Sequence, residues 1–219
     1  MFSIMGHEDV IKTLLNKGAN VSVTAEEGST ALHNAAGRGN LSATIVLVKA
    51  GADLDAAITT NGWTPLHLAA MNDHTEVTEA LLQAGAIINS RTVDGSTPLA
   101  VAAEFSNIGP VRVLLRQRRT RCWPSHRGRR LHWSWQRNGH SEVVRELIQQ
   151  VGIEGCGGDS GGVLALLAAA KEQHVGAMRV LADDAGVVDT GIVLVFAVRH
   201  GLEAAVKFLL RQQETGKTG

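Results

Sequence analysis

Apolar and polar positions in this chain follow a helical pattern that itself recurs at a longer period. A leucine followed by alanines three and four residues later occurs at Leu32, Leu66 and Leu99, which is a repeat of about 33 residues. An amphipathic stretch of period 3.6 follows, as in 76–83, where Val77, Ala80, Leu81 and Leu82 share the apolar face. The pattern predicts stacked pairs of helices, none of which buries its apolar face alone.

The ends of the expected helices carry matching signals. Thr64 precedes Pro65, so we expect the threonine to cap a first helix and the proline to occupy its first turn, where a missing N–H costs nothing. Gly85 follows the second helix, and glycine adopts the left-handed conformation that commonly ends a helix. Each unit is therefore expected to be a helix, a turn and a second helix.

The block Thr64-Pro-Leu-His-Leu-Ala-Ala resembles the start of an ankyrin repeat, and related blocks begin at Thr30 and Thr97. The resemblance implies an all-α ankyrin-repeat solenoid of about six to seven units, several of them degenerate, joined by short β-hairpin-like loops. We expect a partial repeat at 1–23, well-formed repeats at 24–116, an aberrant Arg/Trp-rich segment at 117–137 within the fifth repeat, degenerate repeats at 138–211 and a polar tail at 212–219.

Weaker copies extend the repeat at both ends. Leu166 with Ala169 and Ala170 predicts a sixth unit, and Leu194 a seventh, whose smaller spacing from Leu166 implies a shortened connection. Residues 6–20 read as a second helix whose first helix is missing. The apolar face of that helix, formed by Val10, Ile11, Leu14 and Leu15, therefore lacks a partner. We therefore expect this helix to fray. An alternative to an independent binding protein is that the chain is a fragment of a larger multidomain protein, without independent activity.

Composition restricts the cellular setting and the chemistry. The 219 residues are 44% hydrophobic with no net charge, and no continuous apolar run is long enough to span a membrane. The N-terminus shows no secretory signal. Cys122 and Cys156 form neither a disulfide framework nor a metal-binding set. We expect an intracellular location, cytoplasmic or nuclear, and no membrane partner.

One window departs from the repeat pattern. Nine arginines and no Asp or Glu lie between Glu104 and Glu142, together with Trp123, Trp133 and Trp135. Such a cluster could bind nucleic acid through phosphates and stacked bases. However, position 132 lies one repeat length after Leu99, so repeat length is kept while residue identity is lost. Two compensating frameshifts would produce this combination, and we favour that hypothesis over a nucleic-acid site in 112–137.

Other motifs do not indicate an enzyme. Cys156–Gly162 resembles the nucleophile segment of chymotrypsin-like serine proteases, but the preceding chain predicts helical repeats instead of the required barrels. Gly216-Lys-Thr is half of a phosphate-binding loop without its first glycine. His33 and His67 are expected to bond the neighbouring backbone, and His7, His74, His140 and His174 to begin second helices. We expect no catalytic residue, no metal and no cofactor.

The resemblance implies a non-enzymatic scaffold or adaptor that binds a partner protein through the concave helix face and the hairpin fingers of repeats two to four. Large aromatic residues at such surfaces can be anchors, although Trp63 could instead pack on the adjacent hairpin and Phe105 could cap its helix. The expected contact residues are Asn34, Arg38, Trp63, Leu68, Met71, Asn72, Arg91, Asp94, Val101, Glu104 and Phe105, and further finger candidates are Glu26, Glu27, Thr60, Asn61 and Thr92.

Overall fold

The computed structural model describes residues 8–118, 141–146, 149, 166, 167, 169–184 and 191–215. These residues form helices joined by turns, and within these ranges the only β-type pairing is an isolated bridge between Thr24 and Thr30. The chain divides into two compact units, Met1–Trp123 and Pro124–Gly219. Each unit is described by itself.

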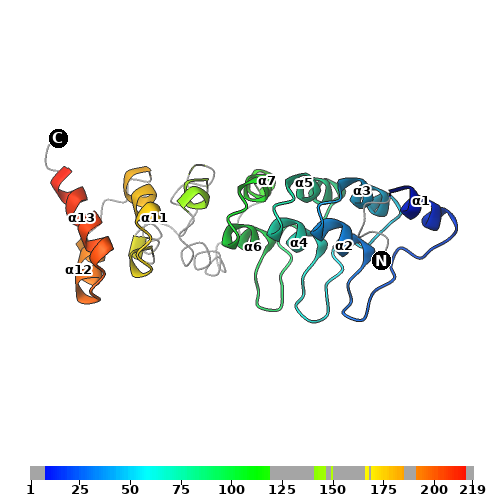
Figure 1. Ribbon diagram of the computed structural model, residues 1–219, viewed down its shortest axis with the longest axis horizontal. Coiled ribbons are helices and arrows are strands. Elements are labelled where there is room, and N and C mark those ends of the chain that lie inside the picture. The colour runs from blue at the N-terminus through cyan, green and yellow to red at the C-terminus, as the bar shows by residue number, and fades with distance from the viewer. Residues whose placement is uncertain are drawn as a thin grey trace. The chain divides into compact units, whose positions relative to one another are not determined.

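The first unit is a stack of helix pairs. Figure 1 shows the first helices α2, α4 and α6 in one row and the second helices α3, α5 and α7 in a second row, with α1 at its end. The bounds are α1 Glu8–Asn16, α2 Ala31–Gly37, α3 Leu41–Lys49, α4 Pro65–Met71, α5 Thr75–Ala84, α6 Pro98–Glu104 and α7 Ile108–Arg118. Helix α7 thus continues two residues beyond the boundary expected at 116.

Much of the core of this unit is formed by the stacked first helices, and further buried side chains such as Leu47, Leu81 and Leu114 come from the second helices. Leu32, Leu66 and Leu99 are completely buried, as are the alanines three and four residues after each of them. Small alanines let α2, α4 and α6 approach closely, while each leucine adds roughly 2 kcal/mol of burial energy. The period of the sequence is therefore the period of the core.

The expected helix ends are present. Thr30, Thr64 and Thr97 occupy the N-cap positions of α2, α4 and α6, with Pro65 in the first turn of α4. The backbone N–H of Thr64 donates to Nδ1 of His67 at 3.2 Å, so an otherwise unpaired helix-end donor is satisfied. Gly85 ends α5 in the left-handed region with φ of 105°.

The buried face of the second helix differs from the sequence prediction. In α5, Val77 and Leu81 are buried as expected, but Ala80 and Leu82 are only half-buried. The polar Thr78 is completely buried instead. Its hydroxyl donates to the backbone carbonyl of His74 at 2.9 Å, which satisfies the hydroxyl within its own helix and removes the cost of burying it.

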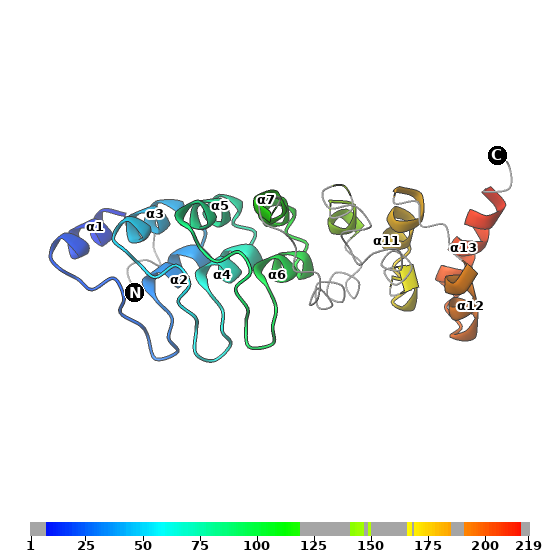
Figure 2. The ribbon, with the colours of Figure 1, turned by 180° about the vertical axis from the view of Figure 1, so that it is seen from behind.

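Helix α1 is the expected second helix of a partial repeat, and it packs on α3 (Figure 2). Ile11 is buried in this contact. Val10 and Leu14 remain 36% and 39% exposed. The predicted apolar face is therefore only partly covered within the described residues.

The second unit repeats the helix pair with weaker sequence signals. Leu166, Ala169 and Ala170 are buried on a helical segment, as predicted. The second helix of that pair is α11, Val175–Arg179, which continues as the π-helix η3, Val180–Asp184. Helices α12, Gly191–Arg199, and α13, Glu203–Thr215, form the next pair, and α13 also contacts α11.

The seventh repeat keeps the backbone pattern but shifts its buried face. The N–H of Leu202 donates to the carbonyl of Ala197, which matches the bond from His174 to Ala169 one repeat earlier. This equivalence places Leu194 at the expected leucine position. Leu194 is nevertheless half-buried, whereas Val193 is completely buried. The core position that the sequence assigned to Leu194 is therefore occupied mainly by Val193.

The C-terminal helix extends into the segment expected to be a polar tail. The polar tail was expected from 212, but α13 continues to Thr215, and the side-chain amide of Gln212 donates to Asp183 at 2.8 Å.

Several sequence predictions lie outside the described residues. These are the Arg/Trp-rich segment from 119 to 137, the protease-like Cys156–Gly162, the terminal Gly216-Lys-Thr, His7 and His140.

Candidate functional site

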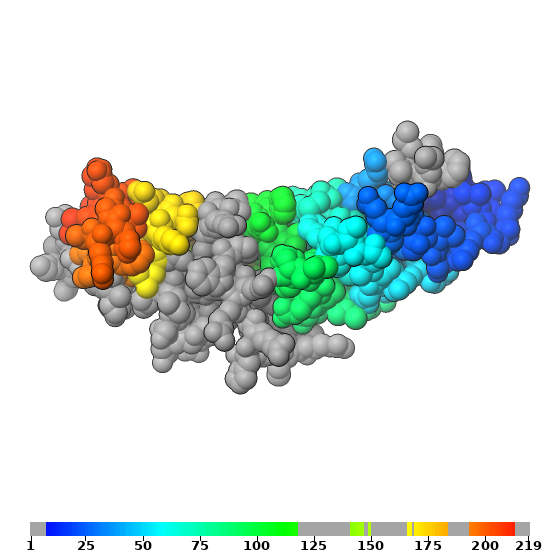
Figure 3. Space-filling model, turned by 90° about the horizontal axis from the view of Figure 1, so that it is seen from below, coloured from blue at the N-terminus to red at the C-terminus, as the bar shows by residue number. Residues whose placement is uncertain are grey.

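The loops before α2, α4 and α6 form three fingers, at residues 19–29, 52–63 and 87–96. A backbone hydrogen bond closes each finger. The donors are the N–H groups of Ala25, Ile58 and Thr92, and the acceptors are the carbonyls of Ser29 at 2.8 Å, Trp63 at 2.9 Å and Ser96 at 3.0 Å. Figure 3 shows the three fingers next to one another in chain order, seen from the side on which they end. They are the hairpin-like loops that the sequence predicted.

Backbone hydrogen bonds align neighbouring fingers. The N–H of Thr59 donates to the carbonyl of Glu27 at 3.0 Å, and the N–H of Val93 donates to the carbonyl of Asn61 at 2.9 Å. Glu27 and Asn61 are finger candidates from the sequence, and their carbonyls serve this alignment. These bonds join the backbones of the three fingers into a continuous edge.

Histidines connect each helix start to the next finger. Nε2 of His33 lies 3.1 Å from the carbonyl oxygen of Trp63, and Nε2 of His67 lies 3.2 Å from that of Ser96. On the other side of each ring, Nδ1 accepts the backbone N–H of the capping threonine. Since Nδ1 accepts, Nε2 must carry the hydrogen and donate to the carbonyl. The structural role predicted for His33 and His67 is confirmed.

Burial keeps both imidazoles neutral. It lowers the pKa of His67 to about 4 and lowers the pKa of His33 below its ordinary value, because an imidazolium loses hydration inside the stack. The carbonyls of Ser96 and Trp63 act in the opposite direction but do not reverse the shift. The two rings are therefore structural donors at neutral pH and not general bases.

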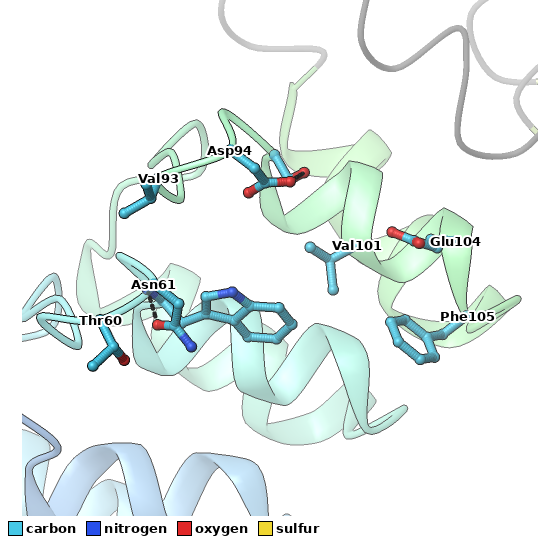
Figure 4. A pocket seen from close by; sticks show the side chains of 9 residues that line it. Thr60, Asn61, Val93, Asp94, Val101, Glu104 and Phe105 are labelled. Carbon is cyan, nitrogen blue, oxygen red and sulfur yellow. Dashed lines mark hydrogen bonds between the residues drawn. The ribbon is translucent and has the colours of Figure 1, made fainter. Parts of the chain in front are cut away.

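A hollow of about 320 Å³ lies between the third and fourth repeats. Its walls come from the finger of repeat three, the finger of repeat four and the exposed side of α6 (Figure 4). The lining residues are Thr60, Asn61, Trp63, Val93, Asp94, Ser96, Val101, Glu104 and Phe105. The hollow therefore exists only where two successive repeats pack together.

The hollow combines apolar walls with two carboxylates. Trp63, Val101 and Phe105 supply apolar surface, and Asp94 and Glu104 supply negative charge. Both oxygens of Asp94 are held, one by the hydroxyl of Thr92 and the other by that of Ser96 at 2.7 Å. These two hydrogen bonds lower the pKa of Asp94, so its carboxylate is ionised at neutral pH.

The structure brings some of the sequence candidates together and leaves others apart. Trp63, Asp94, Glu104 and Phe105 line the hollow, and Phe105 is 52% exposed. Val101 lines it as well, but it is only 2% exposed and forms its floor. The candidates that do not line the hollow are Asn34, Arg38, Leu68, Met71, Asn72 and Arg91.

The side chains of three of these remaining candidates donate to backbone carbonyls. The side-chain amide of Asn34 donates to the Thr30 carbonyl at 3.2 Å, and the guanidinium of Arg91 donates to the Gly95 carbonyl at 3.1 Å. The amide of Asn72 donates to the carbonyl of Gly37 in the preceding repeat at 3.0 Å. Asn72 therefore ties two repeats together.

Sequence reasoning missed a second residue with this tying role. The side-chain amide of Asn107 donates to the carbonyls of Met71, at 2.6 Å, and Ala70, at 2.8 Å. His74, at the equivalent position one repeat earlier, places Nε2 3.1 Å from the carbonyl of Gly37. The available signal was a polar residue eight positions after the repeat leucine, which is Asn40, His74 and Asn107 in repeats two to four.

In the described part of the chain, no group of three or more His, Cys, Asp or Glu residues is placed to hold a metal ion. Within the same residues, no helix has the length and apolar character needed to cross a membrane.

Comparison with known proteins identifies the class of protein. A family model of three ankyrin repeats matches residues 1–92 and 54–126, which together exceed half of the chain. The chain belongs to the ankyrin repeat family, and its fold is an all-α ankyrin-repeat solenoid. Domains of this family are generally non-enzymatic and mediate protein–protein interactions, and the match indicates no catalytic family.

Individual relatives share only this module. The chain is 34% identical to the tyrosine-protein kinase HTK16 of Hydra vulgaris over 48% of its own length and 14% of the relative's. It is 38% identical to the mouse RelA-associated inhibitor over 44% of its length and 12% of the relative's. It is 36% identical to human Rabankyrin-5 over 46% of its length and 10% of the relative's. The chain thus covers about one eighth of these curated relatives.

Proposed function

We propose that this chain is a non-enzymatic scaffold or adaptor that binds a segment of a partner protein along the fingers and first helices of repeats two to four. The observation that most supports the proposal is the hollow between repeats three and four. It gathers Trp63, Asp94 and Phe105 from separate elements onto one open surface. A shallow hollow on an extended face suits a peptide segment better than an enclosed small molecule.

Trp63 and Phe105 are proposed as the anchors of this surface. The backbone of Trp63 is fixed on both sides, because its carbonyl bonds His33 and its N–H donates to the side chain of Asn61 at 3.0 Å. The indole ring lies beside the ring of His67, with centroids 6.1 Å apart. A held aromatic side chain loses little conformational entropy when a partner covers it.

The test uses the full chain as bait for affinity purification with mass spectrometry, followed by measurement of the purified interaction. Substituting Trp63→Ala or Phe105→Ala should weaken the affinity for a captured partner by about tenfold, the usual effect of removing an anchor. The matched control is Ile45→Ala, which removes an exposed apolar side chain from α3 in the other row of helices.

Circular dichroism of each variant establishes that the helices remain. Partners that bind wild type, Ile45→Ala, Trp63→Ala and Phe105→Ala with equal affinity would contradict the proposed surface. Partners lost only with the two aromatic substitutions would support it.

A further inference from the structure

The two carboxylates of the hollow flank its apolar floor. Asp94 comes from the finger that precedes α6, whereas Glu104 is the last residue of that helix. Figure 4 shows the side chain of Val101 between these two ends, with Phe105 beside Glu104. None of the described residues that line the hollow is Lys, Arg or His. The described lining of the hollow therefore combines negative charge with an apolar surface.

The negative charge of Asp94 is held in position. Its oxygens accept from the hydroxyls of Thr92 and Ser96, which hold the carboxylate in one orientation. The Thr92 side chain is itself buried, so this part of the finger is fixed before any partner binds. A preorganised acceptor costs less entropy on binding than a mobile one.

Trp63 adds an aromatic surface to the hollow. Its indole lies beside the ring of His67, and burial keeps that imidazole neutral by lowering its pKa to about 4. An indole attracts a cation through its negative face, and this attraction adds to that of nearby carboxylates. Aromatic and carboxylate groups on one surface therefore select for the same kind of guest.

We infer that the hollow binds an arginine or lysine side chain presented by the partner protein. The aliphatic stem of such a side chain covers Val101 and Phe105, and its charged head is attracted by Asp94, Glu104 and the indole of Trp63. This inference rests on the proposed function, because it names the chemistry of the segment that the repeat surface binds. Neutral aliphatic and acidic side chains are the competing occupants.

A positional-scanning peptide library tests the inference with the full chain. One position at a time carries a fixed amino acid while the others are randomised, and binding to immobilised chain is measured. We expect Arg or Lys to give the strongest signal at one position. A selected peptide is then resynthesised with citrulline in place of Arg, or acetyl-lysine in place of Lys, and should bind at least about tenfold more weakly.

Matched charge variants assign the effect to the hollow. The double substitution Asp94→Asn with Glu104→Gln should weaken the selected peptide by about tenfold and remove the preference for Arg or Lys. The control, Asp73→Asn with Glu76→Gln, removes the same charge from exposed positions at the start of α5. It should change the affinity by no more than about twofold.

The outcomes separate this inference from the proposed function. Peptides without a basic preference that bind the Asp94/Glu104 double variant as well as wild type, yet are lost in Trp63→Ala, would overturn the inference and leave the proposed surface supported. Selected basic peptides that bind Trp63→Ala and Phe105→Ala as well as wild type would overturn both. A library with no peptide above background would also count against both.

Discussion

Nε2 of His67 lies 3.2 Å from the carbonyl oxygen of Ser96, so one imidazole joins the start of α4 to the finger of the following repeat. His33 makes the same connection to Trp63 at 3.1 Å. Ala100 occupies the equivalent position in repeat four and has no ring to extend the series. The histidines thus fix the two fingers that carry Trp63 and Ser96, and with them the walls of the hollow.

The first prediction concerns the pH dependence of stability. The folded state resists protonation of His67 down to about pH 4, because burial disfavours the imidazolium, whereas the unfolded state takes up a proton near pH 6.5. The unfolded state therefore binds more protons between these values, and the free energy of unfolding should fall as pH is lowered through this window. The full loss from His67 is on the order of 3 kcal/mol. Urea unfolding at several pH values measures it.

His67→Gln provides the control for this titration. We expect the variant to be less stable than wild type at pH 7.5, because it loses the paired bonds to Thr64 and Ser96, but to show a shallower decline towards pH 4.5. His33 remains in the variant and keeps part of the slope, since burial also lowers the pKa of His33. An unchanged slope would show that another group titrates.

The second prediction tests the contact between neighbouring fingers. Gly62 has φ of +72°, and a Cβ atom added there would lie 2.9 Å from the backbone nitrogen of Val93. Gly62→Ala should therefore cost about 2 kcal/mol or more, from the left-handed backbone and from displacement of the next finger. Equilibrium urea unfolding monitored by circular dichroism measures the loss.

Gly37→Ala is the matched control for this substitution. Gly37 is the last residue of α2 and has ordinary helical backbone geometry, and an added Cβ would meet Leu68 at 3.6 Å, a normal contact distance. Alanine should be neutral there or stabilising by about 0.5 kcal/mol, through higher helix propensity. If Gly62→Ala and Gly37→Ala had the same stability, the close approach of the fingers would be refuted.

The third prediction concerns the residue that sequence reasoning missed. Asn107→Ala removes two side-chain donors from the carbonyls of Ala70 and Met71 and should cost about 2 kcal/mol. The equivalent substitution Asn40→Ala removes one cap bond, to Ala43 N–H at 3.0 Å, and should cost about 1 kcal/mol. Thermal unfolding measures the stability of the two variants. An Asn107→Ala protein as stable as wild type would contradict the proposed role of Asn107 in joining the two repeats.

The periodic part of the structure could be predicted from the sequence because a repeat is specified locally. The buried Leu32 and Leu66 and the bonded His33 and His67 each follow from one block and its spacing. Thr78 was missed because its burial depends on a hydroxyl bonding its own helix, which makes a polar residue behave as an apolar one.

The hollow required the structure. Trp63 and Phe105 were expected as separate surface residues, and only the packing of one repeat on the next shows that they line the same hollow. Val101 was expected to face the partner, but it is almost completely buried at the floor of the hollow, and its exposure depends on how the finger of repeat four packs against α6. The position of one repeat relative to the next is set by tertiary packing, which the sequence pattern of a single repeat does not encode.

The last prediction concerns the local stability of α1. Among the described residues, α1 packs on α3 and buries Ile11, while Val10 and Leu14 remain partly exposed. The ion pair between Lys12 and Glu8 lies in solvent, where such pairs contribute little. Helix α5, by contrast, contacts α3, α4 and α7. Amide hydrogens of α1 should therefore exchange much faster than those of α5, since local opening costs less there.

Hydrogen exchange followed by mass spectrometry compares peptides covering 8–16 and 75–84 in the same sample. Leu14→Ala should lower the protection of the 8–16 peptide less than Ile11→Ala does, because Leu14 is 39% exposed and Ile11 is buried. Ile11→Ala should abolish the remaining protection of α1 while α5 keeps its own, since Ile11 is the buried side chain of that helix. Equal protection of α1 and α5 in wild type would mean that further contacts cover the apolar face of α1.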